Sequence, residues 1–233
     1  MKKLLVVLLA LTFVFGMVAC NQVNPNAKSE GVMTYAQYDA AKVDDAVVIE
    51  GFVQAKQSWW DNKATVYLQD GEGAYFIYEL TCSEEDYAKM TIGKKIKVTG
   101  YKTEWAGEIE VASGATFEFV DTTDTWVATA MDATSLLGTD DLIKHQNKLV
   151  KFTEMTVVKI EYKNGEPGDD IYVTLSKGDA EYSFCVEYYL TGDDTDVYKA
   201  VGELKAGDVI NVEGFLYWYN AVNTHITAVS KVG

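Results

Sequence analysis

A duplicated pattern constrains the fold of this 233-residue chain more than any other feature. Residues 93–100 and 207–214 both read G-x-x-I-x-V-x-G, and the two copies lie 114 residues apart. A second match lies upstream, where Tyr78–Thr81 (YELT) resembles Tyr188–Thr191 (YYLT) at a spacing of 110 residues. Two matches in the same order and at nearly the same spacing indicate an internal repeat. We therefore expect two related domains.

Each copy predicts the same order of short strands and helices. Val, Ile, Thr, Tyr and Phe dominate short runs that Gly, Asp and Asn interrupt, which is typical of strands joined by turns. The first copy predicts a helix over 34–41, strands over 46–57, 63–69 and 74–80, a helix over 83–90 and strands over 95–103 and 108–111. The second predicts a helix over 134–145, strands over 148–163, 171–175 and 181–190, a helix over 194–201 and strands over 208–218 and 225–229.

Three strands, a helix and two further strands form the order of an OB-fold, a five-stranded Greek-key barrel. The segments that carry a resemblance to the OB-fold modules of exported bacterial proteins are 48–53 (VIEGFV), 66–71 (VYLQDG), 75–78 (YFIY) and 93–100. Such modules often show an EG-x-V first strand, an LQDG turn and a V-x-G fourth strand. The resemblance is good over 46–111 and weaker over 148–229, where 175–178 (LSKG) replaces the LQDG turn.

The N-terminus has the pattern of a secretory signal that ends in a cysteine. Lys2 and Lys3 precede an apolar run over 4–17 that is too short for a comfortable membrane span, and small residues then lead to Cys20. The ending MVAC resembles the lipobox of bacterial lipoproteins, with Met17 where Leu is usual. The resemblance implies cleavage before Cys20, a lipid on Cys20 and a position in the cell envelope, facing outside the cytoplasm. An ordinary secretory signal with a chance cysteine is the alternative.

The expected fold class is therefore all-β with short helices: two tandem five-stranded OB-fold-like Greek-key barrels after a lipoprotein signal peptide. The expected domains are a signal peptide over 1–19, a lipidated polar tether over 20–32, a first barrel over 33–121 and a second over 122–233.

The charge of the chain disfavours a nucleic acid partner. The chain has no arginine and a net charge of −15, which becomes −17 when the two lysines of the signal are removed. Arginine is the commonest specific reader of guanine, phosphate contacts need clustered cations, and an acidic domain repels polyanions at long range. One feature opposes this expectation, a stripe of lysines on the expected fourth strand: Lys94, Lys95, Lys97 and Lys102.

The sequence contains no motif typical of catalysis, so we expect no enzymatic activity, no cofactor and no metal. His145 and His225 are isolated; we expect the first at a solvated helix end and the second on the exposed side of a strand. The acidic clusters at 169–170 and 193–196 lack the spacing of a calcium-binding loop. Solvated loop and helix-cap acids explain them better.

Two cysteines remain besides Cys20. An extracytoplasmic setting would permit a disulfide between Cys82 and Cys185. Such a bridge would have to cross between the two halves of the chain. We therefore expect two separate buried thiols.

Aromatic residues are the candidates for ligand contact. Trp59 and Trp60 follow the first strand, in a loop where OB-folds often meet ligands. Period-two alternation assigns one side of the next two strands to the core: Val66, Leu68, Tyr75 and Ile77. It places Tyr67, Phe76 and Tyr78 on the other side, which could form a platform for bases or sugars. Trp105, further along the chain, is one more candidate for ligand contact. The structural alternative is aromatic packing within strands or at a domain seam.

From these observations we expect a non-catalytic, membrane-anchored lipoprotein that binds a protein or glycan partner through its aromatic surface. The alternative is single-stranded nucleic acid binding by the OB-folds, as an accessory to extracellular nucleic acid processing. The barrel order and the lysine stripe favour this alternative, and the charge opposes it.

Overall fold

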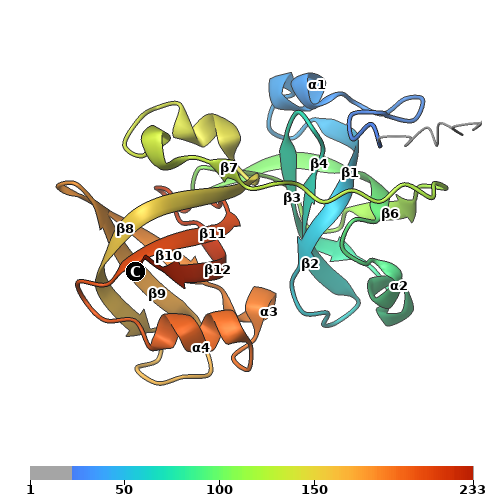
Figure 1. Cartoon of the computed structure of the whole chain (residues 1–233). Coiled ribbons are helices and arrows are strands. Elements are labelled where there is room, and N and C mark those ends of the chain that lie inside the picture. The colour runs from blue at the N-terminus through green and yellow to red at the C-terminus, as the bar shows by residue number, and fades with distance from the viewer. Residues whose placement is uncertain (1–22, 233) are drawn as a thin grey trace, which may run out of the picture.

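A computed structural model describes residues 23–232 as two β-barrels that lie side by side (Figure 1). The expected signal segment and Cys20, with its lipid, lie outside the described residues. Within residues 23–232 no helix has the length and apolar character needed to cross a membrane.

The first barrel closes a ring of five strands and adds a sixth strand at its edge. The strands are β1 (Ala46–Lys56), β2 (Lys63–Gln69), β3 (Ala74–Thr81), β4 (Lys95–Trp105), β5 (Glu108–Val111) and β6 (Thr116–Phe119). The ring order is β1-β2-β3-β5-β4, and pairing of β1 with β4 closes it. Only the β3–β5 pair of the ring is parallel. Helix α1 (Tyr35–Ala40) precedes the barrel, and α2 (Glu84–Lys89) connects β3 to β4.

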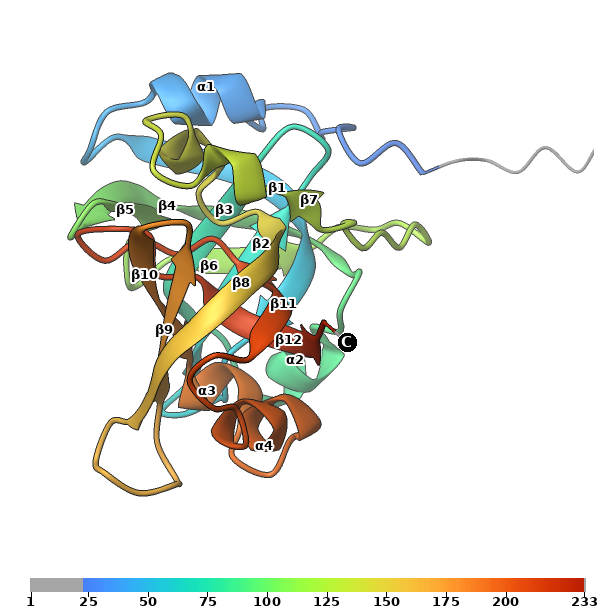
Figure 2. The ribbon, with the colours of Figure 1, turned by 60° about the vertical axis from the view of Figure 1, so that its left-hand side comes forward.

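The second barrel repeats the five-stranded ring. Its strands are β7 (Met131–Asp132), β8 (Leu149–Tyr162), β9 (Ile171–Lys177), β10 (Ala180–Val186), β11 (Val209–Phe215) and β12 (His225–Lys231). The ring order is β8-β9-β10-β12-β11, closed by β11 on β8, with β10 and β12 parallel, and the extra strand β7 is parallel to β8. Helices α3 (Tyr188–Thr191) and α4 (Asp196–Gly202) lie side by side at one end of this barrel (Figure 2). The expected fold class of two tandem five-stranded OB-type barrels is confirmed.

The two largest differences between the predicted elements and the structure lie in the second barrel. The helix expected over 134–145 is two short 3-10 helices, η1 (Thr134–Leu136) and η2 (Leu142–His145), separated by Gly138 at a φ of 75°. The strand expected over 181–190 ends at Val186, because the Glu187 side chain accepts a hydrogen bond from the Tyr189 N–H and starts α3. The matched segments YELT and YYLT are therefore a strand in one barrel and a helix in the other.

Each barrel has its own core. Alternation along β2 and β3 places Val66, Leu68, Tyr75 and Ile77 in the first core, as predicted. The second core is centred on Phe152 and its neighbours. The side of β2 and β3 that faces away from the first core is the one that carries Tyr67 and Phe76.

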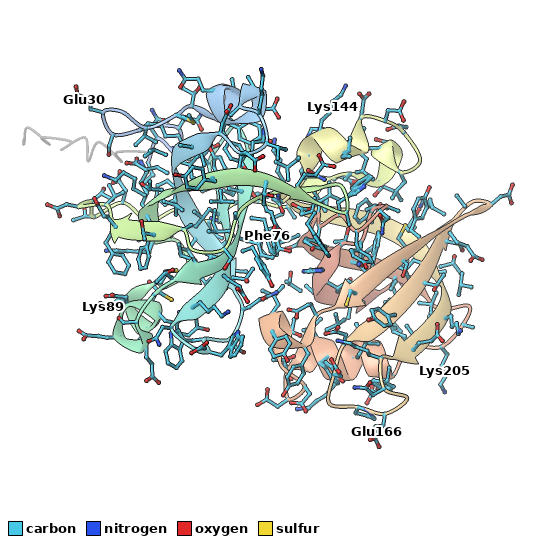
Figure 3. The ribbon with its side chains drawn as sticks, turned by 180° about the vertical axis from the view of Figure 1, so that it is seen from behind. Glu30, Phe76, Lys89, Lys144, Glu166 and Lys205 are labelled. Carbon is cyan, nitrogen blue, oxygen red and sulfur yellow. The ribbon has the colours of Figure 1, made fainter. Side chains whose placement is uncertain are left out.

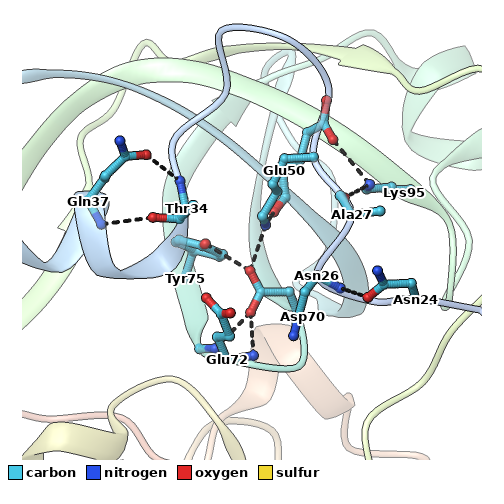
Figure 4. A network of polar contacts seen from close by, with 12 residues as sticks. Asn24, Asn26, Ala27, Thr34, Gln37, Glu50, Asp70, Glu72, Tyr75 and Lys95 are labelled. Atoms are coloured by element: carbon cyan, nitrogen blue, oxygen red, sulfur yellow. Dashed lines mark hydrogen bonds and ion pairs between the residues drawn. The ribbon is translucent and has the colours of Figure 1, made fainter.

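The LQDG turn of the first barrel is held by Asp70, which is buried. Its Oδ1 accepts the N–H groups of Glu72 and Gly73 at 2.8 and 2.7 Å, and its Oδ2 accepts the Tyr75 hydroxyl at 3.0 Å (Figure 4). An aspartate that bonds the backbone two and three residues ahead defines a tight turn. The same view shows α1 starting at Thr34, whose hydroxyl accepts the Gln37 N–H in a capping box.

Part of the expected tether packs against the first barrel. The Lys28 ammonium pairs with Asp70 at 2.6 Å, and the Ser29 N–H donates to Glu50 at 3.1 Å. Lys95 pairs with the same Glu50 at 3.1 Å and also donates to the Ala27 carbonyl. Both acidic partners are almost fully buried. The segment from Lys28 onward is therefore a strap fixed to the barrel and does not stand free of it.

A shared aromatic cluster joins the two barrels. Tyr67 and Phe76 of the first barrel pack with Phe215 of the second, and Phe76 lies between the barrels in Figure 3. Polar bonds flank the cluster. Glu108 accepts the Trp218 N–H at 2.8 Å, and Gln69 accepts the Leu149 N–H at 2.9 Å. We call this contact the interbarrel seam.

Candidate functional site

A cavity of about 630 Å³ opens beside the interbarrel seam. Its volume falls within the usual range of small-molecule sites. The first barrel contributes most of its lining, and α3, β12 and the segment after β11 contribute the rest. The lining residues are Gln57, Ser58, Trp60, Lys63, Ala64, Thr65, Phe76, Tyr78, Glu79, Glu187, Tyr189, Tyr217 and His225.

A tight hairpin between β1 and β2 presents Trp60 at the rim. The N–H and carbonyl groups of Trp60 and Lys63 bond each other at 3.1 and 3.0 Å. The two residues between them, Asp61 and Asn62, have positive φ angles of 48° and 59°, as a two-residue turn of this kind requires. Trp60 is 58% exposed, and the Lys63 ammonium lies 4.6 Å from the centre of its ring. A large flat ring therefore stands open to solvent at the cavity mouth.

Two more exposed rings share the cavity. Tyr78, on β3, is 43% exposed, and Tyr189, on α3, is 55% exposed. Tyr189 is held in place because its carbonyl accepts the Ser58 N–H at 2.7 Å and the Ser58 hydroxyl at 3.2 Å. Three exposed aromatic rings from both barrels therefore line one space.

His225 forms part of the inner wall and is neutral. Its Nδ1 lies 2.9 Å from the Tyr67 hydroxyl, and its ring stacks on Tyr217 with centroids 4.4 Å apart. Burial lowers the pKa of His225 to about 3. Tyr67 is fully buried and has no other side-chain partner in residues 23–232, so its hydroxyl donates to Nδ1 and the proton of the ring resides on Nε2. The expectation of an exposed His225 is wrong, because the first barrel covers that side of β12.

Two hydrogen-bonded side chains, Gln57 of the first barrel and Glu187 of the second, form the polar floor of the cavity. Gln57 Nε2 donates to Glu187 Oε2 at 3.1 Å, and the Tyr189 N–H donates to Glu187 Oε1 at 3.2 Å. Burial, together with the negative charge of Asp170, raises the pKa of Glu187 to about 7, although two backbone N–H groups and Lys163 oppose the shift. Glu187 therefore exchanges its proton near neutral pH.

The structure brings together only part of the predicted aromatic platform. Trp60 and Tyr78 face the cavity, and Phe76 lines it while remaining buried. Tyr67 is fully buried in the seam. The remaining two residues contribute nothing to the cavity lining: Trp59 is half-buried and donates its indole N–H to the Cys82 carbonyl at 3.0 Å, and Trp105 is exposed at the end of β4.

The second barrel contributes four lining residues that the sequence did not predict as ligand contacts: Glu187, Tyr189, Tyr217 and His225. Tyr189 lies within the repeated YYLT segment and Glu187 directly precedes it, so the repeat included this region but did not indicate a site. Only docking of the barrels shows that α3 faces the β1–β2 hairpin.

The predicted lysine stripe is not a basic surface. Lys95 is buried against Glu50, and Lys97 pairs with Glu118 at 2.9 Å. Lys102 is buried and donates to three backbone carbonyl groups at the C-terminal end of α1, at 2.8–2.9 Å. These lysines therefore serve the fold of the first barrel.

Acidic and cysteine residues outside the cavity have structural roles. Asp170 accepts the Tyr188 N–H at 2.9 Å and pairs with Lys163 at 3.0 Å. Cys82 and Cys185 are free and buried, as predicted. Residues 23–232 contain no group of three or more His, Cys, Asp or Glu side chains arranged to hold a metal.

Comparisons with known proteins find similarity at the level of structure. No family model and no curated protein sequence matches the chain. A HIN1 domain of p202 in complex with 12-mer double-stranded DNA aligns over 91% of this chain and 100% of its own, with a TM-score of 0.37 and 9% identity. The Ifi202 HINa domain with 20-bp double-stranded DNA aligns over 80% and 98%, with a TM-score of 0.36 and 12% identity. A Replication Protein A heterotrimer bound to single-stranded DNA aligns over 81% and 52%, with a TM-score of 0.33 and 11% identity.

These findings overturn the expectation of a protein or glycan partner with nucleic acid disfavoured. The three similar structures were solved with DNA. Of the aromatic surface that carried the expectation, Tyr67 and Phe76 are buried, whereas Trp60, Tyr78 and Trp105 are exposed. The similarity itself is too distant to transfer a ligand.

Proposed function

We propose that this protein binds unpaired bases of single-stranded nucleic acid in the cavity beside the interbarrel seam. One observation carries the proposal: Trp60, Tyr78 and Tyr189 are exposed rings from two OB-type barrels, and all three line the same cavity. Every base has an aromatic face, so rings of this kind bind bases largely irrespective of sequence, at about 1–3 kcal/mol per stacked base.

The charges around the cavity define how such a strand would bind. Lys63 is the one lysine among the lining residues, and it pairs with Glu79 at 3.0 Å. Phosphate contacts therefore contribute little, and the net charge of −15 repels a polyanion. Binding should rest on stacking, with the sugar-phosphate backbone outside the cavity. It should consequently be weak and depend little on salt, in contrast to binding that releases many counterions.

Fluorescence anisotropy with a labelled, unstructured strand of about twelve nucleotides tests this proposal. Trp60→Ala and Tyr189→Ala should each weaken binding about tenfold, as the loss of one stacked base predicts. Trp105→Ala is the matched control, because Trp105 is a tryptophan of 62% exposure outside the cavity lining and should leave binding unchanged. Equal affinities for all four proteins, or no binding by the wild-type chain, would refute the proposal.

We further propose that the barrels work without catalysis at the outer side of a membrane, held by a lipid on Cys20. The MVAC ending of the N-terminal apolar segment supports this location. Metabolic labelling with a fatty acid, compared between the native chain and Cys20→Ala, tests it.

A further inference from the structure

The polar floor of the cavity offers hydrogen-bond acceptors in a defined arrangement. Each oxygen of Glu187 accepts one hydrogen bond, Oε2 from Gln57 and Oε1 from the Tyr189 N–H. A carboxylate oxygen has two lone pairs, so each oxygen keeps one for a ligand. The side chain is half-buried and lines the cavity together with the exposed rings. Glu187 therefore presents two adjacent acceptors to the edge of a base bound in the cavity.

Two adjacent acceptors discriminate among the bases. On its Watson–Crick edge guanine carries two neighbouring donors, N1–H and the N2 amino group, which match a carboxylate in a bidentate contact. Adenine and cytosine offer one donor beside one acceptor on that edge, and thymine or uracil offers one donor between two acceptors. With any of these bases, an acceptor atom of the base would face one oxygen of the Glu187 carboxylate. That oxygen would lack a hydrogen-bond donor, which costs binding free energy.

We propose that the cavity selects guanine among unpaired bases, with Glu187 accepting hydrogen bonds from guanine N1–H and the N2 amino group. This inference rests on the proposed function and adds base specificity to it. Gln57 and the Tyr189 backbone act as positioning groups, because they fix the carboxylate without contacting the base.

The aromatic rings and the other charged side chains of the lining are compatible with one purine whose Watson–Crick edge faces Glu187. Trp60, Tyr78 and Tyr189 supply stacking area, which a purine uses more fully than a pyrimidine. The rim carboxylate of Glu79 is already engaged by Lys63 at 3.0 Å and by the Ser113 hydroxyl at 3.0 Å. Glu187 is thus distinguished from Glu79, the other carboxylate of the lining, because a lysine already neutralises Glu79.

Base substitution with the wild-type protein tests the inference without altering the fold. Short thymine strands with one central guanine, adenine, cytosine or thymine are titrated by anisotropy. Guanine should bind about tenfold more tightly than adenine, the discrimination expected of one bidentate contact. Inosine, which lacks the N2 amino group, should lose most of that preference. A 7-deazaguanine strand should keep it, because it retains both donors.

Two variants locate the specificity. Glu187→Gln replaces two acceptors by one acceptor and one donor and should abolish the preference for guanine over adenine. Glu79→Gln, the matched control on the rim, should preserve it. Equal binding of all four bases by the wild-type protein would overturn guanine selection and leave the proposed function standing, whereas no binding of any strand would overturn both.

Discussion

The ring of Tyr67 stacks on the ring of Phe215 across the interbarrel seam, with centroids 4.4 Å apart and planes 15° from parallel. Tyr67 comes from β2 of the first barrel and Phe215 ends β11 of the second. The stacking places Trp60 and Tyr78 of one barrel opposite Tyr189 of the other, because the cavity opens beside this contact. The seam therefore builds the site.

The Tyr67–His225 hydrogen bond should stabilise the seam measurably. Tyr67→Phe removes the donor and leaves a buried imidazole nitrogen unpaired, which should lower the free energy of unfolding by about 1–3 kcal/mol. Urea denaturation followed by circular dichroism measures the change. Tyr101→Phe, at a side chain 62% exposed, is the control and should have no effect. Equal stability of the two variants would contradict the assigned bond.

Stability should fall at alkaline pH because of Glu108. Burial raises the pKa of this seam carboxyl from 4.5 to about 8; the nearby Asn147 side chain and the Trp218 N–H oppose the shift, and Glu110 adds to it. A raised pKa in the folded state contributes stability that is complete below the unfolded value of 4.5 and is lost as pH rises through 8. Glu108→Gln should therefore be more stable than wild type at pH 9, by roughly 2–4 kcal/mol.

Thermal or urea unfolding of both proteins at pH 5 and pH 9 checks this. At pH 5 the two proteins should differ little. Burial likewise raises the pKa of Glu110 to about 7, so the variant should retain a smaller dependence on pH. Parallel pH profiles for the two proteins would contradict the role given to Glu108.

The N-terminal strap should depend on Lys28. Lys28→Met removes the cation that pairs with buried Asp70 and should cost about 1–3 kcal/mol, because an acceptor of charge-assisted bonds loses its partner. It should also make residues 23–33 more sensitive to a protease under native conditions. Lys89→Met, which removes only exposed ion pairs on α2, should change neither property. Unchanged protease sensitivity would contradict a fixed strap.

The preference for guanine should depend on pH through Glu187, whose pKa of about 7 reflects burial and Asp170. Other charged groups near it are Lys163, which opposes the shift, and Lys63 and Glu79 in the lining, whereas His225 stays neutral. Above pH 7 the carboxylate offers two acceptors, and below pH 7 the acid offers one. The ratio of guanine to adenine affinity should therefore rise between pH 6 and pH 8.5. A ratio that stays constant would contradict the role of Glu187.

The fold of each barrel could be predicted from local signals. Alternation along β2 placed Val66 and Leu68 in the core, and Thr34 marked the start of α1. The end of β10 could not be predicted in this way, because the same YYLT letters suit a strand. A single capping bond from the Tyr189 N–H to Glu187 makes the segment a helix.

The site was harder to predict because it depends on contacts between the barrels. Alternation correctly put Tyr67 and Phe76 on the side of the sheet away from the core, yet Phe215 covers that side. Lys95 and Lys102 follow the spacing of a solvated stripe, yet they bind Glu50 and the end of α1. Periodicity identifies which side of a strand a residue occupies, and tertiary packing decides whether that side meets water.

The central claim is that unpaired bases stack on the rings of the cavity. The most direct measurement compares the affinity of the wild-type protein for three probes of equal length: an unstructured single strand, an abasic strand with the same phosphates, and a duplex. We predict that the single strand binds at least about tenfold more tightly than either of the others, the loss expected when one stacked base is removed or remains paired. Equal affinity for the abasic strand would show that phosphates carry the binding and would contradict the claim.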